Sequence, residues 1–140
     1  NDRSLVSAAI DETLRLEPSV TLVDRYATTA TELSGVAIAE GDLVSVSLAA
    51  ANRDPAVFDL PDQFDIHRHN LRQHVTFVQG PHRCLGMHLA RLETQIALNA
   101  VLDHLPGLVF DQQNSTPARG LVFRKPVAVT ALWESSTKLP

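Results

Sequence analysis

FVQGPHRCLG, residues 77–86, contains the only cysteine of the chain, Cys84. Gly80 and Pro81 precede this cysteine, Gly86 follows it, and a long helical pattern begins directly afterwards. The first turn of a helix carries unpaired N–H groups and partial positive charge, so a thiol there loses its proton more readily than a free thiol. A single thiolate with one open face suits a metal centre, and haem iron accepts such a ligand. The sequence therefore predicts a metal-binding cysteine loop.

Composition limits the kinds of function that the chain can have. The 140 residues suffice for one domain with a modest core, and the net charge of −4 comes without any basic run that would indicate nucleic-acid binding. No apolar run approaches the roughly 20 residues that span a bilayer. One cysteine excludes an internal disulfide, which is compatible with a reducing compartment. We expect a cytoplasmic protein that binds neither nucleic acid nor membrane.

Four other motifs accompany the cysteine loop. In chain order they are Glu12-x-x-Arg15, ANRDP at 51–55, FDIHR at 64–68 and, after the cysteine, ARLE at 90–93. With the spacing Phe77-x-x-Gly80-x-x-x-Cys84-x-Gly86, the chain resembles the cytochrome P-450 superfamily of haem-thiolate monooxygenases, in its bacterial soluble type. The resemblance covers essentially the whole sequence.

The resemblance implies that the chain is the C-terminal third of a longer protein. The long distal helix with its acid–alcohol pair for oxygen activation is missing from the sequence, as are most elements that cover the substrate pocket. The absence of an initiator methionine and of a signal-peptide pattern agrees with a piece of a longer chain. We expect this part alone to be inactive.

The expected fold class is α+β, within a mainly helical parent fold. Residues 1–140 would form one C-terminal haem-binding portion: a helix with Glu-x-x-Arg over 1–17, a small mixed β-sheet over 18–50, a meander loop over 54–76, the cysteine ligand loop over 77–86, a long proximal helix over 85–105, and the strands of a terminal β-hairpin over 108–133.

Hydrophobic periodicity predicts the elements in more detail. Asp2 or Ser4 can cap the first helix, whose buried face would hold Leu5, Ala8, Ala9, Glu12, Arg15 and Leu16. Strands are expected at Ala27–Leu33, Val36–Ile38, Val44–Val46, Leu108–Phe110, Leu121–Phe123 and Val127–Val129, and a short helix at Leu48–Asn52. Phe58 and Phe64 would anchor the meander. The stripe Leu85, Leu89, Leu92, Ile96 and Ala100 would pack in the core, and 135–140 would fray.

Glu12 and Arg15 have two interpretations. Spacing alone favours a surface ion pair, worth a few tenths of a kcal/mol. The resemblance instead implies a buried structural triad of Glu12, Arg15 and Arg68, which ties the helix to the loop before the haem.

The resemblance also assigns the cofactor site. Haem b would be bound through Cys84 as the axial thiolate, with Arg25 and His82 on its propionates, although Arg25 could equally be a solvated strand residue. Phe77 would cover the sulfur and exclude water. Gly80 and Gly86 would allow close approach of the backbone to a flat ligand. Val78 departs from the small or polar residue usual in the family, and its branched side chain predicts an extended backbone.

The remaining assignments concern substrate and partners. Val20, Leu22, Val122 and Phe123 are candidates for the pocket of a small hydrophobic organic substrate, although each could be plain core. The parent enzyme would insert one oxygen atom of O2 into that substrate. Electrons would come from a ferredoxin- or flavodoxin-type donor docked on the proximal face, near Arg72, Arg83 and Arg91.

Two other functions remain open. One is a non-enzymatic haem-binding module or remnant. The other is a zinc-binding interaction domain using Cys84, His88 and two upstream histidines, although structural zinc sites usually carry at least two cysteines. Of the remaining histidines, His74 matches a family histidine upstream of the loop, whereas His67, His69, His88 and His104 are expected to be ordinary surface residues.

Overall fold

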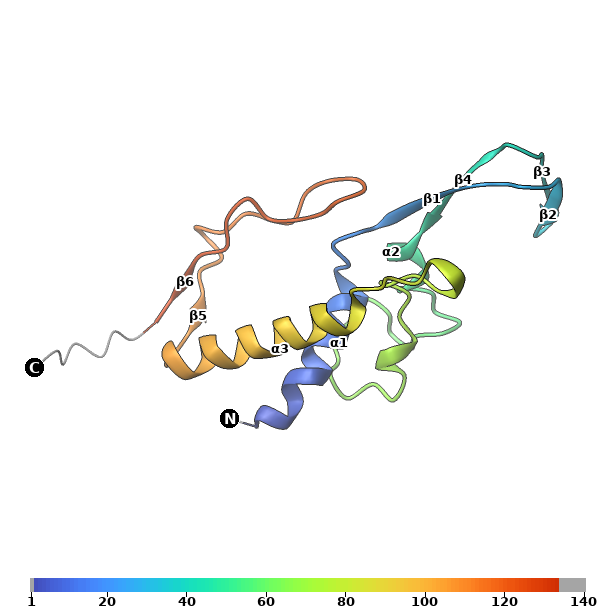
Figure 1. Cartoon of the computed structure of the whole chain (residues 1–140). Helices are drawn as coiled ribbons and strands as arrows, with labels where there is room; N and C mark the ends of the chain where they lie inside the picture. The colour runs from blue at the N-terminus through green and yellow to red at the C-terminus, as the bar shows by residue number, and fades with distance from the viewer. Residues whose placement is uncertain (1, 134–140) are drawn as a thin grey trace, which may run out of the picture.

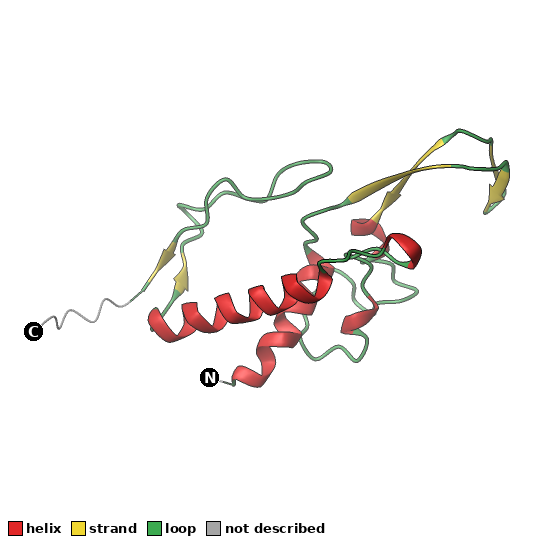
Figure 2. Ribbon diagram, viewed as in Figure 1, coloured by secondary structure: helices red, strands yellow, loops and turns green. Residues whose placement is uncertain are grey.

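The computed structural model describes residues 2–133, so the predicted frayed end at 135–140 lies outside the described residues. Two helices, α1 (Val6–Leu16) and α3 (Met87–His104), cross and pack on each other (Figure 1). A β-arm extends from one end of this crossing, and a second arm formed by the residues after α3 folds back over α3 (Figure 2). The mixture of helices and antiparallel strand pairs confirms the α+β class.

Helix α1 begins after a 3-10 turn, Arg3–Leu5, which Asp2 caps by accepting a hydrogen bond of 2.9 Å from the Ser4 amide. It ends at Leu16, two residues before Pro18. The buried face differs from the predicted one, because α3 and the loop around Leu71–Gln73 cover a neighbouring stripe. Its buried members are Val6, Ile10, Asp11, Glu12 and Arg15, whereas Leu5, Ala8, Ala9 and Leu16 are only half-buried.

The β-arm consists of two antiparallel pairs, β1 (Leu22–Tyr26) with β4 (Leu43–Ser47), and β2 (Thr31–Leu33) with β3 (Val36–Ile38). The predicted mixed sheet is therefore wrong for the described residues, and so is a continuous strand over Ala27–Leu33. Ala27 exchanges its backbone hydrogen bonds with the turn at Gly41 and Asp42, which closes the β1–β4 ladder there. The turn at Ser34-Gly35, between β2 and β3, has positive φ at both residues, as a tight hairpin requires.

The short helix α2 (Leu48–Ala51) leads into the meander, which anchors on only one of its two aromatic residues. Phe58 is buried, and the Arg15 guanidinium lies 5.2 Å from the centre of its ring. Phe64 is 54% exposed, so its predicted anchoring role is wrong. The backbone on both sides of Phe64 faces α1, because Gln63 accepts from Arg15 and Asp65 donates to Glu12, which turns the intervening side chain outward.

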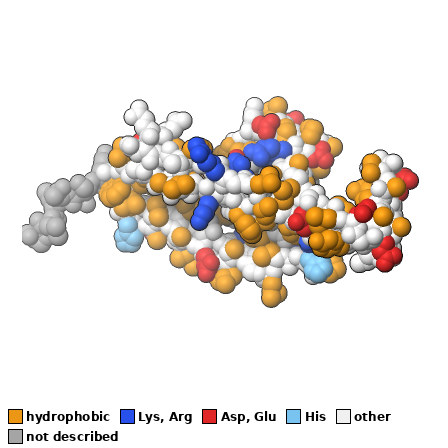
Figure 3. Space-filling model, turned by 90° about the horizontal axis from the view of Figure 1, so that it is seen from above, with side chains coloured by type: hydrophobic (Ala, Val, Ile, Leu, Met, Phe, Trp, Pro, Cys, Tyr) orange, Lys and Arg blue, Asp and Glu red, His pale blue; other side chains and the backbone are white. Residues whose placement is uncertain are grey.

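Helix α3 begins at Met87, so Leu85 precedes it and is 99% exposed. The predicted apolar stripe does not form a core within residues 2–133, since Leu89, Leu92 and Ile96 are each more than half exposed. The buried apolar residues of the described chain are few: Val6, Ile10, Leu48, Phe58 and Met87. Figure 3 accordingly shows apolar side chains spread over the visible face. Much of the apolar surface of α3 is therefore left uncovered by the described part of the chain.

The segment after α3 contains one short strand pair, β5 (Val109–Phe110) with β6 (Ala131–Leu132). The strands predicted at Leu121–Phe123 and Val127–Val129 are wrong, because the first stretch forms only the isolated bridge Val20↔Phe123 and the second forms no strand or bridge. In this segment, side-chain hydroxyl groups make hydrogen bonds that backbone carbonyls would make in a regular β-ladder. The Thr116 hydroxyl accepts from the amides of Val127 and Ala128, and the Ser115 hydroxyl accepts from the amide of Thr130.

Candidate functional site

Cys84 lines a mostly apolar cavity of about 360 Å³ where four elements and the cysteine loop meet. The loop contributes Phe77, Val78, His82 and Cys84 itself. The other lining residues are Leu14 of α1, Ser19 and Val20 before β1, Val23 of β1, Leu48 of α2, Thr76, and Ala90 of α3. Segments far apart in the sequence therefore surround a single thiol with aliphatic side chains.

Backbone hydrogen bonds close the cysteine loop. The Cys84 amide donates to the Phe77 carbonyl at 2.9 Å, and the Val78 amide donates to the Val75 carbonyl at 2.8 Å. Gly80 has φ +78°, which a glycine adopts without strain. Gly86 has an ordinary φ, but a Cβ there would lie 4.0 Å from the Cys84 sulfur. The missing side chain at Gly86 thus leaves one side of the exposed sulfur uncovered.

Val78 adopts a left-handed backbone conformation with φ +61°, so the extended conformation predicted for it is wrong. The two hydrogen bonds that close the loop, on either side of Val78, impose this conformation. A β-branched residue in this region is rare and costs about 1–2 kcal/mol. The loop therefore keeps its turn despite the valine, at the expense of local strain.

We expect Val78→Gly to stabilise the protein relative to a matched glycine substitution next to it. Gln79→Gly is the control, because Gln79 has φ −128° and its replacement relieves no strain. Both substitutions to glycine raise the backbone entropy of the unfolded chain, so the control accounts for most of this common cost. Urea unfolding should place Val78→Gly about 1–2 kcal/mol above Gln79→Gly. Equal stabilities would contradict strain at position 78.

Glu12, Arg15 and Arg68 form one hydrogen-bonded cluster. The Glu12 carboxylate accepts from Arg15 Nε at 2.7 Å and Nη2 at 2.8 Å, from Arg68 Nε at 3.0 Å, and from the Asp65 amide at 2.9 Å. Glu12 and Arg15 are both fully buried. Burial alone would raise the pKa of Glu12, but the hydrogen bonds from Arg15, the Asp65 amide and Arg68 outweigh it and hold this pKa below its ordinary value. The cluster attaches α1 to the meander.

Asn52 connects this cluster to the cysteine loop, a role that the ANRDP motif did not reveal. Its carbonyl accepts from Arg15 at 2.9 Å, and its side chain accepts from the Val75 amide at 2.8 Å and donates to the Thr76 hydroxyl at 2.9 Å. Thr76 in turn donates to the Leu14 carbonyl of α1. Asn52 is fully buried, so it fixes the start of the loop from inside.

A second polar cluster joins α1, α3 and the cysteine loop. Arg91 donates from Nε to Asp11 at 3.0 Å, and its Nη2 lies 3.1 Å from His74 Nε2. Its guanidinium carbon lies 5.2 Å from the centre of the Phe77 ring. Asp11 and His74 are both 4% exposed. No local pattern predicts the pairing of Asp11 with Arg91; the one sign of it in the sequence is that each residue lies beside or within a motif.

Burial lowers the pKa of His74 below its ordinary value; the nearby Asp11 carboxylate opposes this shift, and the charge of Arg91 adds to it. Below about pH 6.5 the unfolded chain therefore binds a proton that the native state does not. We expect stability to fall as the pH drops from about 7 to about 5, with His74 contributing a slope of up to about 1.4 kcal/mol per pH unit.

Unfolding curves of His74→Gln against pH would measure that contribution. The slope should flatten in His74→Gln, whereas the matched variant of the exposed His67, His67→Gln, should keep the native slope. A native slope in His74→Gln would contradict a buried, neutral imidazole at this position.

Arg25 and His82, the predicted propionate ligands, differ in their position relative to the cysteine cavity. His82 lines the cysteine cavity and is exposed. Arg25 does not line it, but it shares a face of β1 with Val23, which does. Its Nη1 donates to the neighbouring Asp24 carbonyl at 2.7 Å. Arg25 therefore lies two residues along β1 from Val23, the β1 residue that lines the cavity.

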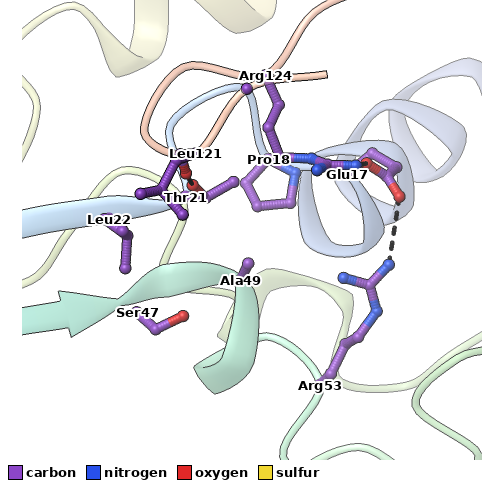
Figure 4. Close-up of a pocket in the computed structure, with 10 residues that line it drawn as sticks. Glu17, Pro18, Thr21, Leu22, Ser47, Ala49, Arg53, Leu121 and Arg124 are labelled. Atoms are coloured by element: carbon purple, nitrogen blue, oxygen red, sulfur yellow. Dashed lines mark hydrogen bonds and ion pairs between the residues drawn. The ribbon is translucent and has the colours of Figure 1, made fainter. Parts of the chain in front are cut away.

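The four candidate substrate residues fall into two places. Val20 lines the cysteine cavity and bridges to Phe123, so these two lie side by side. Leu22 instead lines a separate cavity of about 400 Å³ together with Thr21, Leu121 and Arg124 (Figure 4). The Val122 carbonyl accepts from the Thr21 amide at 2.9 Å. The cavity in Figure 4 is polar, because Glu17 sits there within 3.4 Å of Arg53 and 3.7 Å of Arg124.

The three arginines predicted to meet a redox partner lie together. Arg72, Arg83 and Arg91 line one cavity of about 220 Å³, on the other side of Phe77 and Val78 from the cysteine cavity. His88 also lines it. This surface is basic in a chain whose net charge is −4.

The donor set at Cys84 suits haem better than zinc. Within residues 2–133, no three His, Cys, Asp or Glu side chains come together as a metal-binding group, so the geometry gives the zinc hypothesis no support. One sulfur on an aliphatic wall fits the single axial bond and the flat apolar faces of a porphyrin. None of the helices in the described part of the chain is long and apolar enough to cross a bilayer.

Comparison with known proteins identifies the type of protein. The family model for cytochrome P-450 matches residues 1–127. A 20-oxo-5-O-mycaminosyltylactone 23-monooxygenase of Streptomyces fradiae is 45% identical over 130 residues, which are 93% of this chain and 30% of that protein. Pulcherriminic acid synthase of Bacillus subtilis is 35% identical over 144 residues, covering 96% of this chain and 36% of that protein.

Solved structures show the same fold. A Mycobacterium marinum cytochrome P-450 in the substrate-free form superposes with a TM-score of 0.89 at 31% identity, covering 95% of this chain and 35% of that one. Another, solved with a hexadec-9Z-enoic acid-ligated acyl carrier protein, superposes with a TM-score of 0.88 at 37% identity, over 95% of this chain and 34% of that one. The chain spans about a third of the length of these relatives.

Proposed function

The chain belongs to the cytochrome P-450 family, and on that basis we propose that it is the haem-binding C-terminal portion of a bacterial monooxygenase. The whole enzyme would insert one oxygen atom of O2 into a small hydrophobic organic substrate. Because the chain spans about a third of its relatives, it would provide the iron ligand and the proximal side of the site, without the distal groups that activate oxygen.

The observation that carries this proposal is the lone Cys84 on an otherwise largely aliphatic cavity wall, with Gly86 leaving its sulfur accessible. Bound haem b would supply the oxygen chemistry, which electron donation from an axial thiolate favours. The residues of the chain provide the rest. Cys84 would bind the iron, and Leu14, Val23 and Leu48 would exclude water from the porphyrin face.

Polar residues at the edge of the cavity would orient the cofactor. His82 lines the cavity, and Arg25 lies two residues further along β1 than Val23, so both would reach the propionates at the periphery of the porphyrin. A guanidinium fork matches a carboxylate geometrically. Val20, paired with Phe123, would contact substrate from the segment before β1; Leu22 and Val122 are weaker candidates, since Leu22 lines the separate polar cavity.

An electron donor would dock at the basic cavity lined by Arg72, Arg83 and Arg91. A ferredoxin- or flavodoxin-type protein with an acidic surface complements that charge, which would accelerate and orient the encounter. Among the described residues, only Phe77 and Val78 line both this cavity and the cysteine cavity, so the docking surface would lie one residue layer from the cysteine cavity.

The ferrous carbonyl spectrum tests the proposal. The purified protein with haem, reduced and exposed to carbon monoxide, should show the strongly red-shifted Soret band of a thiolate-ligated complex. A spectrum typical of an imidazole ligand would favour a non-enzymatic haem-binding module. Failure to bind haem, together with bound zinc, would contradict the proposal and favour an interaction domain.

A further inference from the structure

Phe77 and Val78 form a wall between two cavities. On one side lies the aliphatic cavity with Cys84, and on the other lies the basic cavity with Arg72 and Arg91; no other residue lines both. The wall also connects directly to the ligand, because the Phe77 carbonyl accepts the hydrogen bond from the Cys84 amide at 2.9 Å. A displacement of Phe77 would therefore move or release the backbone of the cysteine.

Arg91 holds this wall from the basic side. Its guanidinium carbon lies 5.2 Å from the centre of the Phe77 ring, a distance at which the cation is attracted to the ring face. Phe77 is only half-buried, so packing alone leaves its ring partly unsupported. Arg91 comes from α3, thirteen to fourteen residues beyond the wall, and is itself partly exposed.

Asp11 holds Arg91 in turn. Its carboxylate, 4% exposed on α1, accepts from Arg91 Nε at 3.0 Å and lies 2.9 Å from Nη2. The contacts of Nε and Nη2 with the same carboxylate oxygen restrain the orientation of the guanidinium as well as its position. A buried carboxylate requires such a partner, so the pair is mutually dependent. Arg72 also approaches Asp11, at 3.7 Å, but its side chain is 83% exposed.

We propose that Asp11 and Arg91 are positioning residues for the haem ligand: Asp11 orients Arg91, Arg91 holds the Phe77 ring, and Phe77 holds Cys84 at the geometry that iron requires. The inference rests on the proposed haem-thiolate function. Asp11 and Arg91, which are eighty positions apart in the sequence, would thus influence the state of the iron in addition to joining α1 to α3.

Matched lysine substitutions test the proposal in the haem-loaded protein. Arg91→Lys keeps the charge but removes the planar fork over Phe77, while Arg72→Lys makes the same chemical change at a second arginine of the same cavity that also neighbours Asp11. We expect Arg91→Lys to shift the reduction potential of the iron and to raise severalfold the fraction of carbonyl complex lacking the red-shifted band. Arg72→Lys should leave these two readouts at their native values, although it alters the proposed docking surface for the electron donor.

Asp11→Asn provides the second variant, which also serves if Arg91→Lys fails to retain haem. It should change both readouts in the same direction, and adding it to Arg91→Lys should cause little further change, because both act through Phe77. Native spectra and potential in Arg91→Lys and Asp11→Asn would overturn the inference, as would equal shifts in Arg72→Lys. If the unmodified protein itself lacks the red-shifted band, the proposed function fails, and this inference fails with it.

Discussion

Cys84→Ser is expected to abolish the red-shifted Soret band of the reduced carbonyl complex while leaving the helix and strand content unchanged. An alcohol does not replace a thiolate on iron, and the chain has no second cysteine to substitute for it. Cys84 is exposed, so the smaller oxygen removes little packing. The carbonyl difference spectrum and far-ultraviolet circular dichroism would measure the two effects on the same sample.

His82→Gln is the matched control for this substitution. His82 lines the same cavity, and its imidazole is the nearest alternative iron ligand among the loop residues. Its replacement should preserve the red-shifted band even if haem is held less tightly. Persistence of the band in Cys84→Ser, or its loss in His82→Gln, would mean that Cys84 is not the axial ligand.

Glu12→Gln is expected to destabilise the protein by about 3–5 kcal/mol, the range found when one partner of a buried ion pair is removed. Arg15 is fully buried, and after the substitution its charge would lack the carboxylate that now accepts two of its hydrogen bonds. Arg68 would lose its bond to the same group. Glutamine keeps the shape of the glutamate side chain, so the change in the free energy of unfolding measures the loss of the negative charge. Urea unfolding of the two proteins would measure the difference.

Glu17→Gln, near the end of the same helix, is the control. Glu17 approaches Arg53 and Arg124, but its side chain is 51% exposed, and exposed ion pairs contribute only about 0–1 kcal/mol. If Glu12→Gln proved as mild as Glu17→Gln, the cluster around Glu12 would not be what attaches α1 to the meander.

The residues that belong to a recognisable motif could be predicted from the sequence. Glu12 and Arg15 come from one motif and Arg68 from another, and the structure brings both arginines within hydrogen-bond distance of Glu12. The helix predicted over 85–105 runs from Met87 to His104, because its apolar periodicity is present in this stretch by itself. These features depend on local patterns that each stretch contains by itself.

Other features depend on contacts that no local pattern encodes. The contact of Arg91 with Asp11 and Phe77 joins three elements, and none of the three residues indicates the others. Propensity predicted an extended Val78, but closure of the loop imposes φ +61°. The apolar stripe on α3 predicted burial without indicating its partner, and the chain spans only about a third of its relatives.

X-ray absorption at the iron edge of the ferric, haem-loaded protein tests the central claim most directly. Cys84 ligation predicts one sulfur scatterer in the coordination shell of the iron, which disappears in Cys84→Ser and remains in His82→Gln. A coordination shell with only nitrogen or oxygen neighbours in the unmodified protein would contradict it.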